Sequence, residues 1–465
     1  MLTFEVEDPR MAIFLDPRAS TDPVRWHEIA AELRRDHPVF PVEHDLISRF
    51  YAITRHEDVF EISRRNDIWN NTRHSVLMPD IQQQLLDGMG FTPHTLVHMD
   101  GHEHTEHRKV TNDWFKPAAV KTRQEAIDSI ADTFVEKLRD LGGECDFAQD
   151  IAVPYTLHVI MEIFGVPPED EPRMLELTQR MFGAADPEYM GDMSDPFQTV
   201  VGTINDFQAY FNELSEERRR NPTEDLATVI ATGEVDGEPL GETAELWYYI
   251  IVATAGHDTT SYGLSGGLAA LLQHPGQVQA LRDDPDLSHN ATEEMIRWTS
   301  PVRQFLRYAQ QDTEIAGVPI AEGERVLLSY PAANRDERVF EGAADFDITR
   351  TDADKLISFG VGAHYCLGSQ FARREIRTMV GDPLDPDLVA EDVARLDNLS
   401  IFAEITVTAE PLGEGDVRVL FTFKEMPSWF PILSYVYTEE NGFSWGAGIS
   451  AGNLTGRDFS VSARV

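Results

Sequence analysis

The chain has 465 residues, of which 42% are hydrophobic and 26% are charged, as in an ordinary globular protein. Its 39 basic and 80 acidic residues give a formal net charge of −41, which argues against binding to nucleic acid or to anionic lipid. Two cysteines cannot build a disulfide framework, and no CxxC pair suggests a zinc or thioredoxin-like centre. The first residues, MLTFEVEDPRMAIFLDPR, lack a secretory signal pattern, so we expect a cytoplasmic protein.

Most of the chain has a helical pattern. Three segments carry apolar residues at helical spacing, separated by Pro and Gly: 26–40, 123–143 and 278–298. The apolar run at 246–256 is too short to span a bilayer and predicts a buried helix. Strand patterns occur at 50–56 and at 313–336, the latter with turns expected at Gly317 and Gly323. The sequence therefore predicts a mainly α fold with a small β subdomain.

The pattern changes after residue 380. One short amphipathic helix is expected at 388–399. Alternating apolar and polar residues then predict antiparallel strands at 402–412, 415–425, 443–452 and 458–465. We therefore expect two domains, 1–380 and a β-rich tail, 381–465.

Cys366 lies among three glycines, Gly360, Gly362 and Gly368, with a helix predicted directly behind it. A buried structural cysteine would not need so open a loop, whereas glycines let the backbone approach a flat group and point N–H groups at sulfur. The positive end of the following helix would favour a thiolate, which can act as a nucleophile, with His364 as its base, or as a metal ligand. Since no other cysteine is near, a metal would need a cofactor to supply its remaining ligands. Haem needs only one protein thiolate.

The stretch FGVGAHYCLG is similar to the haem-binding signature of the cytochrome P450 family, Phe-x-x-Gly-x-His/Arg-x-Cys-x-Gly. The matching positions are Phe359, Gly362, His364, Cys366 and Gly368. The resemblance implies the P450 fold, haem b (iron protoporphyrin IX) as the cofactor, and Cys366 as the iron ligand. It also implies a monooxygenase that uses O2 and receives electrons from a ferredoxin and its ferredoxin reductase.

The stretch AGHDTT, from Ala255 to Thr260, resembles the oxygen-activation motif of this family. Asp258 beside Thr259 in a buried helix can relay protons while bulk water stays out. By the same resemblance Ala255 lies against the haem. The alternative is an Asp–Thr pair that lines a helix without any chemistry.

Glu294 and Arg297 match the Glu-x-x-Arg pair of the family, which implies a structural ion pair that fixes a helix to the loop before the cysteine. Many members complete this set with an arginine directly before the residue that corresponds to Phe346. This chain has Asp345 there, so we expect Arg350 to take its place.

His104 and Arg108 are four residues apart and therefore share a helix face. The resemblance implies that they bind a haem propionate together with Arg307 and His364. The histidine-rich stretch HEHTEH could also indicate a metal site, which the resemblance disfavours.

Basic residues gather in sequence around the cysteine: Arg350, Lys355, Arg373, Arg374 and Arg377. They suggest a docking surface for an acidic ferredoxin, the alternative being an ordinary solvated face.

Residues after Pro301 are candidates for contact with the substrate: Val302, Gln304 and Phe305. The resemblance is to soluble bacterial members and implies an apolar substrate of steroid, terpenoid or fatty-chain type, with no membrane for the main domain.

The likeness to P450 stops near Val380, before the C-terminal hairpin that family members have. The tail instead resembles the second half of a POTRA domain and the first barrel strands of outer-membrane assembly factors. Two strands cannot close a barrel. Three alternatives therefore stay open: an inert chimera of a truncated monooxygenase and an outer-membrane protein fragment, a binding or scaffold protein that acts through the tail, and, more remotely, a cysteine hydrolase.

Overall fold

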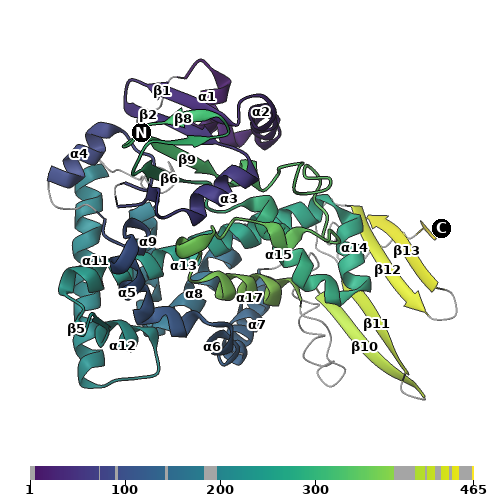
Figure 1. The fold of residues 1–465 in the computed structure, drawn as a ribbon. Helices are drawn as coiled ribbons and strands as arrows, with labels where there is room; N and C mark the ends of the chain where they lie inside the picture. The colour runs from purple at the N-terminus through teal and green to yellow at the C-terminus, as the bar shows by residue number, and fades with distance from the viewer. Residues whose placement is uncertain are drawn as a thin grey trace.

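The computed structural model describes five stretches with their side chains, and five strands of the tail as backbone alone (Figure 1). The stretches are 6–72, 74–88, 93–141, 145–182 and 196–381, where the side chains of 182 and 196–200 are also left out. In Figure 1 the helices form the larger part of residues 6–381, and a small sheet with α1, α2 and α3 lies at one end. The predicted mainly α fold with a β subdomain is confirmed.

The described helices are α1 (Pro9–Leu15), α2 (Pro23–Asp36), α3 (His56–Arg64), α4 (Asp80–Gly88), α5 (Gly101–Asn112), α6 (Pro117–Lys121), α7 (Gln124–Asp140), α8 (Val153–Phe164), α9 (Glu171–Phe182), α11 (Pro196–Arg220), α12 (Leu226–Ala231), α13 (Glu242–Gln273), α14 (Pro275–Asp283), α15 (Ser288–Thr299), α16 (Tyr330–Ala333) and α17 (Ser369–Val380). The predicted helix at 26–40 ends earlier, at Asp36, because Val39 already begins a strand. The segment 278–298 is divided between α14 and α15, as its proline predicts.

The main sheet has five strands in the order β1-β2-β9-β6-β3. Their bounds are β1 (Val39–His44), β2 (Ile47–Ile53), β3 (Trp69–Asn70), β6 (Gln304–Ala309) and β9 (Arg325–Ser329). Two small hairpins accompany it, β4 (Glu234–Val235) with β5 (Glu238–Pro239), and β7 (Thr313–Ile315) with β8 (Val318–Ile320). Gly317 and Gly323 both have positive φ, as the predicted turns require. However, β9 does not extend the β7–β8 hairpin. It pairs with β2 and β6 in the main sheet.

Helix α13 passes through the core and contains the predicted buried run 246–256. Its glycines allow neighbouring helices to approach closely. A Cβ at Gly256 would lie 2.8 Å from Ile160 of α8, and one at Gly267 would lie 2.3 Å from Met295 of α15. Across the described stretches, no helix is both long and apolar enough to cross a membrane.

The tail strands are β10 (Glu404–Gly413), β11 (Asp416–Lys424), β12 (Pro431–Thr438), β13 (Gly442–Ile449) and β14 (Ala463–Arg464). β10 pairs with β11, and β13 pairs with both β12 and β14, all antiparallel. The predicted alternation therefore does form strands, although the sequence did not single out β12. The predicted helix at 388–399 lies outside the described residues. The domain boundary near 381 and the POTRA-like interpretation stay predictions.

Candidate functional site

The cysteine loop is held by backbone contacts that its glycines permit. The Cys366 amide donates a 2.8 Å hydrogen bond to the Phe359 carbonyl, which closes the loop. Gly360 and Gly362 have φ values of +70° and +75°, and a Cβ at Gly362 would lie 2.6 Å from the Ser63 carbonyl oxygen at the end of α3. Only glycine fits there, because that backbone oxygen cannot move aside as a flexible side chain could.

The Cys366 side chain is in contact with both solvent and protein. The side chain is exposed, and yet burial raises the pKa of its thiol. Exposure and an effect of burial on the pKa are compatible for a side chain that solvent reaches but that protein atoms surround. The backbone N–H groups of Gly368 and Ser369 bond to it and, with Arg108, lower the pKa, although burial outweighs them. The expected preference for a thiolate is therefore absent in the chain alone. A cation bound to the sulfur would reverse that balance, because a coordinated thiol loses its proton.

Four basic side chains from three segments meet beside this loop: His104 and Arg108 of α5, Arg307 of β6, and His364. The rings of His104 and His364 have centroids 4.2 Å apart. Arg108 donates a 2.6 Å hydrogen bond to the Tyr365 carbonyl, and Arg307 donates one of 2.8 Å to the Leu306 carbonyl. The structure therefore brings the four predicted propionate ligands into one region, which we call the basic cluster.

The basic cluster has too few acidic partners. His364 Nε2 lies 3.1 Å from Asp100 Oδ1, but within the described residues no carboxylate forms an ion pair with Arg108 or Arg307. His104 Nε2 is buried without a partner there. Burial, His364 and Arg108 lower the pKa of His104 to about 4, and burial lowers the pKa of Arg307. A buried arginine without an acidic partner, beside an imidazole with an unbonded ring nitrogen, fits a ligand that brings its own carboxylates.

One face of α13 is open in the middle of the helix, where the neighbouring His257, Thr260 and Ser261 are buried. Ala255 and Tyr262 are exposed, and Asp258 and Thr259 between them are half-buried. The Thr259 hydroxyl donates a 2.9 Å hydrogen bond to the Ala255 carbonyl, one turn back. Burial raises the pKa of Asp258, so this carboxyl takes up a proton more readily than an ordinary aspartate.

Glu294, Arg297 and Arg350 form a fully buried ion-pair cluster. Arg297 Nε and Arg350 Nε lie 2.6 and 2.8 Å from Glu294 Oε2. Arg297 also donates to the carbonyls of Asn334, Ala343 and Asp345. The cluster joins α15 to the segment that precedes the cysteine loop, and Arg350 is the second guanidinium group on Glu294.

Sequence reasoning gave no role to Asp100, which orients His364 and accepts a hydrogen bond from the Asn71 amide. Its place directly before the stretch GHEHTEHR was the available signal. Although Asp100 and His364 could serve a nucleophile, no hydrogen bond joins His364 to Cys366 among the described residues. The hydrolase alternative therefore gains no support.

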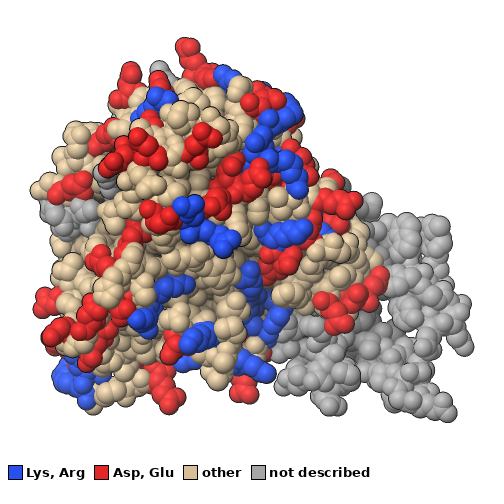
Figure 2. All heavy atoms as spheres, viewed as in Figure 1, with Lys and Arg blue, Asp and Glu red and all other residues tan. Residues whose placement is uncertain are grey.

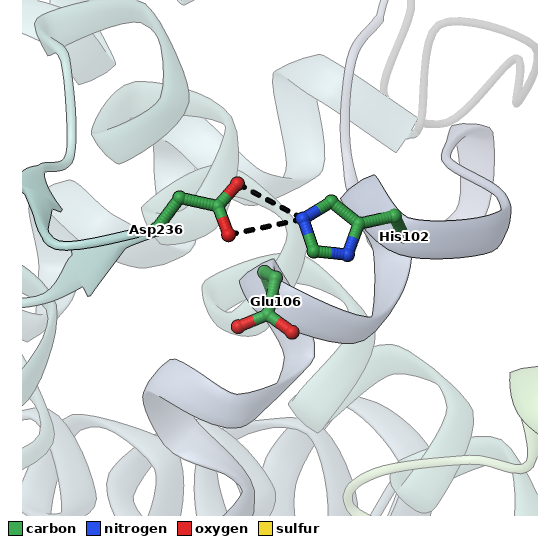
Figure 3. A group of neighbouring side chains, drawn as sticks. All are labelled: His102, Glu106 and Asp236. Carbon is green, nitrogen blue, oxygen red and sulfur yellow. Dashed lines mark hydrogen bonds and ion pairs between the residues drawn. The ribbon is translucent and has the colours of Figure 1, made fainter.

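The histidine-rich stretch has one further cluster, His102, Glu106 and Asp236 (Figure 3). His102 Nε2 lies 3.0 and 3.1 Å from the two carboxylate oxygens of Asp236, and Glu106 pairs with Lys109. Each side chain thus has a protein partner. In Figure 3 Glu106 lies beside the His102–Asp236 contact, and one ligand atom from each of the three side chains lies within 4.8 Å of the other two.

The predicted basic surface is largely neutralised. Arg350 is buried, Arg373 pairs with Glu293, and Arg374 lies 3.4 Å from Asp128. Lys355 is exposed. Sequence adjacency therefore overestimated the free positive charge beside Cys366.

The chain matches the family model described as Cytochrome P450 over residues 78–384. It is 37% identical over 357 residues to Cytochrome P450-terp of a Pseudomonas species, covering 74% of this chain and 83% of that protein. Linalool 8-monooxygenase of Pseudomonas putida is 32% identical over 76% of this chain and 86% of that protein. Steroid C26-monooxygenase of Rhodococcus jostii is 31% identical over 78% of this chain and 76% of that protein.

A crystal structure of a cytochrome P450 from Novosphingobium aromaticivorans superposes with a TM-score of 0.75 at 35% identity, covering 91% of this chain and 98% of that one. The Mycobacterium marinum cytochrome P450 in complex with pseudoionone gives a TM-score of 0.72 at 27% identity, covering 86% and 92%. The fold and the sequence therefore define a haem-thiolate oxygenase, and the chain belongs to the cytochrome P450 family. It is a monooxygenase that uses haem b, O2 and electrons from a redox partner.

The residues present fit this cofactor. An accessible sulfur with N–H groups directed at it suits a haem iron. Arg108 and Arg307, which form no ion pair among the described residues, and the unbonded His104 Nε2 suit its two propionates. When bound, haem supplies the iron at which O2 is reduced and activated. The chain itself binds the cofactor and supplies, on the open face of α13, groups able to hold and move protons.

Proposed function

We propose that the protein hydroxylates an apolar small molecule of terpenoid or steroid type. The observation that carries the proposal is the sulfur of Cys366, which is exposed in a glycine-rich loop and accepts hydrogen bonds from the backbone N–H groups of Gly368 and Ser369. In this proposal Cys366 is the iron ligand, and Phe359, Gly362 and Gly368 shape the loop around it. The basic cluster binds the propionates, and Ala255 gives the haem room.

Asp258 and Thr259 are the proposed catalytic residues. Asp258 holds and releases the protons that O2 reduction consumes, since its carboxyl has a raised pKa and partial access to solvent. Thr259 presents its hydroxyl on the same face. Glu294, Arg297 and Arg350 have a structural role.

The relatives that act on linalool and on steroids by their names support an apolar substrate. Val302, just before β6, and Gln304 and Phe305, at its start, are half-buried and can contact the substrate. Compounds with fatty chains are the third class of substrate to test.

We further propose a ferredoxin as electron donor, which docks at the exposed Lys121 of α6 rather than on the arginines around Cys366. Lys109 and Lys116 nearby are also exposed, but they pair with Glu106 and Asp113. Their segment packs beside the haem loop, because Phe115 contacts Phe371 of α17 with ring centroids 5.7 Å apart. Figure 2 shows basic side chains gathered over the region where Figure 1 draws α5, α6 and α17.

The test is a substrate panel of monoterpenes, sterols and fatty acids. Each compound is added to the purified haem protein, and the spin-state shift is recorded. Compounds that shift the spectrum are then incubated with a ferredoxin, its reductase and NADH. We expect hydroxylated terpenoid or steroid products. A spectrum typical of thiolate-ligated haem without any shift or product across the panel would contradict the proposed substrate class.

Thr259→Ala tests the proposed proton supply, with Thr260→Ala as its matched control. Both hydroxyls donate to a carbonyl one turn back, but Thr260 is buried on another face of α13. We expect Thr259→Ala to lose most of the product formed per NADH while NADH oxidation continues, and Thr260→Ala to keep it. Equal losses in the two variants would contradict the role of Thr259.

A further inference from the structure

His257 is an imidazole that the mechanism has not used, although it precedes Asp258 in the open turn of α13. Its side chain is 0% exposed, whereas that of Asp258 is 41% exposed. His257 Nε2 lies 3.1 Å from Asp258 Oδ1 and 3.3 Å from the Thr178 hydroxyl of α9. The His257 carbonyl accepts a 3.1 Å hydrogen bond from Thr156 of α8. Three helices therefore fix this residue.

The hydrogen on the imidazole can be assigned from the bonds of Thr178. This hydroxyl lies 3.0 Å from the carbonyls of both Met174 and Leu175, so its one hydrogen is directed into its own helix. Its oxygen is then an acceptor toward His257. Because Asp258 also offers an acceptor, His257 Nε2 must carry the hydrogen and donate it to both.

We propose that His257 is a positioning residue for Asp258, whose Nε2–H holds the carboxylate in one orientation and favours its ionised form. This inference rests on the proposed function, in which Asp258 moves protons. An acid that must release a proton in every cycle needs an interaction that opposes the rise of its pKa on burial. The buried N–H of His257 stabilises the carboxylate in this way, and because the imidazole is neutral it adds no buried charge.

The surroundings agree with a neutral imidazole. Burial lowers the pKa of His257 and outweighs Asp258 and the carbonyls of Ala253 and Thr254, which raise it; His257 in turn opposes the effect of burial on the pKa of Asp258. The other charged groups of α8 and α9 are engaged elsewhere or exposed. His158 pairs with Glu171, Arg180 pairs with Glu176 and Asp206, Arg173 lies over the Tyr210 ring, and Glu162 is exposed. Within the described residues, Asp258 is the one ionisable group that reaches His257.

Two substitutions separate donation from packing. His257→Gln keeps an N–H donor at a similar reach, whereas His257→Leu keeps the bulk and removes the donor. Thr178→Val removes the α9 partner of the imidazole but leaves its contact with Asp258. If His257 only joined helices, Thr178→Val would behave like His257→Leu.

The experiment follows protonation of Asp258 in the haem-loaded protein by infrared spectroscopy of its carboxyl C=O band, assigned by its absence in Asp258→Asn. We expect the midpoint to rise by about one pH unit in His257→Leu and to stay within a few tenths in His257→Gln and Thr178→Val. The pH dependence of product formed per NADH should move in the same direction. Equal midpoints in His257→Leu and the parent protein would overturn the inference, as would equal shifts in the Leu and Gln variants.

If His257→Leu does not fold, His257→Gln and Thr178→Val still decide the matter. The inference needs both to keep the parent midpoint, and a rise in either overturns it. The infrared midpoint does not depend on turnover. Should Asp258→Asn keep full product formation, the proposed role of Asp258 fails, whereas the His257–Asp258 interaction stands or falls on the midpoint alone.

Discussion

Two groups of basic and acidic side chains near the cysteine loop differ in how completely they are paired. In the cluster of Glu294, Arg297 and Arg350 the carboxylate binds two guanidinium groups, and carbonyls take further N–H groups. In the basic cluster, Arg307 has no ion pair among the described residues, and His104 Nε2 is left without a partner. A satisfied cluster stabilises the fold, whereas an unsatisfied one is completed by a ligand.

The comparison predicts its largest effect for Glu294→Ala. Removing this carboxylate leaves the buried Arg297 without an ion pair and Arg350 with Asp352 alone, which should lower the free energy of unfolding by about 3–5 kcal/mol. Urea denaturation measures it. Glu28→Ala is the matched control, because it removes an exposed i, i+3 partner of Arg25 and should cost less than about 1 kcal/mol. Similar losses in both variants would contradict a structural role for the buried cluster.

Arg307→Leu should affect haem binding and leave the stability of the haem-free chain unchanged. The chain without haem should lose no stability, because the removed cation has no carboxylate to leave behind. The loaded protein should release haem roughly tenfold faster, through loss of a charge-assisted hydrogen bond. Transfer of haem to an excess of a scavenger protein gives the rate. An unchanged release rate together with a destabilised chain would place Arg307 with the structural cluster.

The lowered pKa of His104 predicts that the stability of the haem-free chain depends on pH. The pKa of His104 in the folded chain is about 4, below its ordinary value of 6.5. Between these values the unfolded chain binds a proton that the folded chain does not, so stability should fall as the pH falls from 6.5 toward 4. His104→Phe should flatten this part of the curve, while His98, with a pKa also near 4, titrates in both proteins.

Denaturation of the haem-free chain across this range measures the effect. Bound haem should reduce the difference between the two proteins, since a propionate would then partner His104. Parallel curves for the variant and the parent would contradict the unpaired state of this imidazole.

The smallest effect is expected at the surface. Lys121→Glu should raise the KM for ferredoxin about two- to fivefold at low salt, and high salt should remove the difference. Arg25→Glu makes the same change of charge on α2, at the other end of the molecule in Figure 1, and should have no effect. Turnover at varied ferredoxin concentration measures both variants. Equal effects would argue against docking at α6.

The sequence predicted best where one local pattern fixes the geometry. The glycines around Cys366, the buried run of α13 and the turn at Gly317 are local, and all appear in the structure. Arg350 could be proposed because Asp345 stands where an arginine is usual. Contacts between residues that are far apart in the sequence could not be predicted from a local pattern. Asp100 is 264 residues from His364, and Thr178 is 79 residues from His257.

The same reason explains the overestimated basic surface. Arg373 is close to Cys366 in sequence, but its partner, Glu293, comes from another helix. For the tail, alternation predicted that strands form, and it does not determine what they pack against.

The most direct test of the account is the spectrum of the reduced, carbon monoxide-treated protein, compared between the parent chain and Cys366→Ala. We predict the red-shifted Soret band of thiolate-ligated haem in the parent chain and its loss in the variant, with Cys145→Ala unchanged as the control for the second cysteine. A protein that stays colourless after haemin is supplied, or a variant that keeps the band, would contradict haem ligation by Cys366.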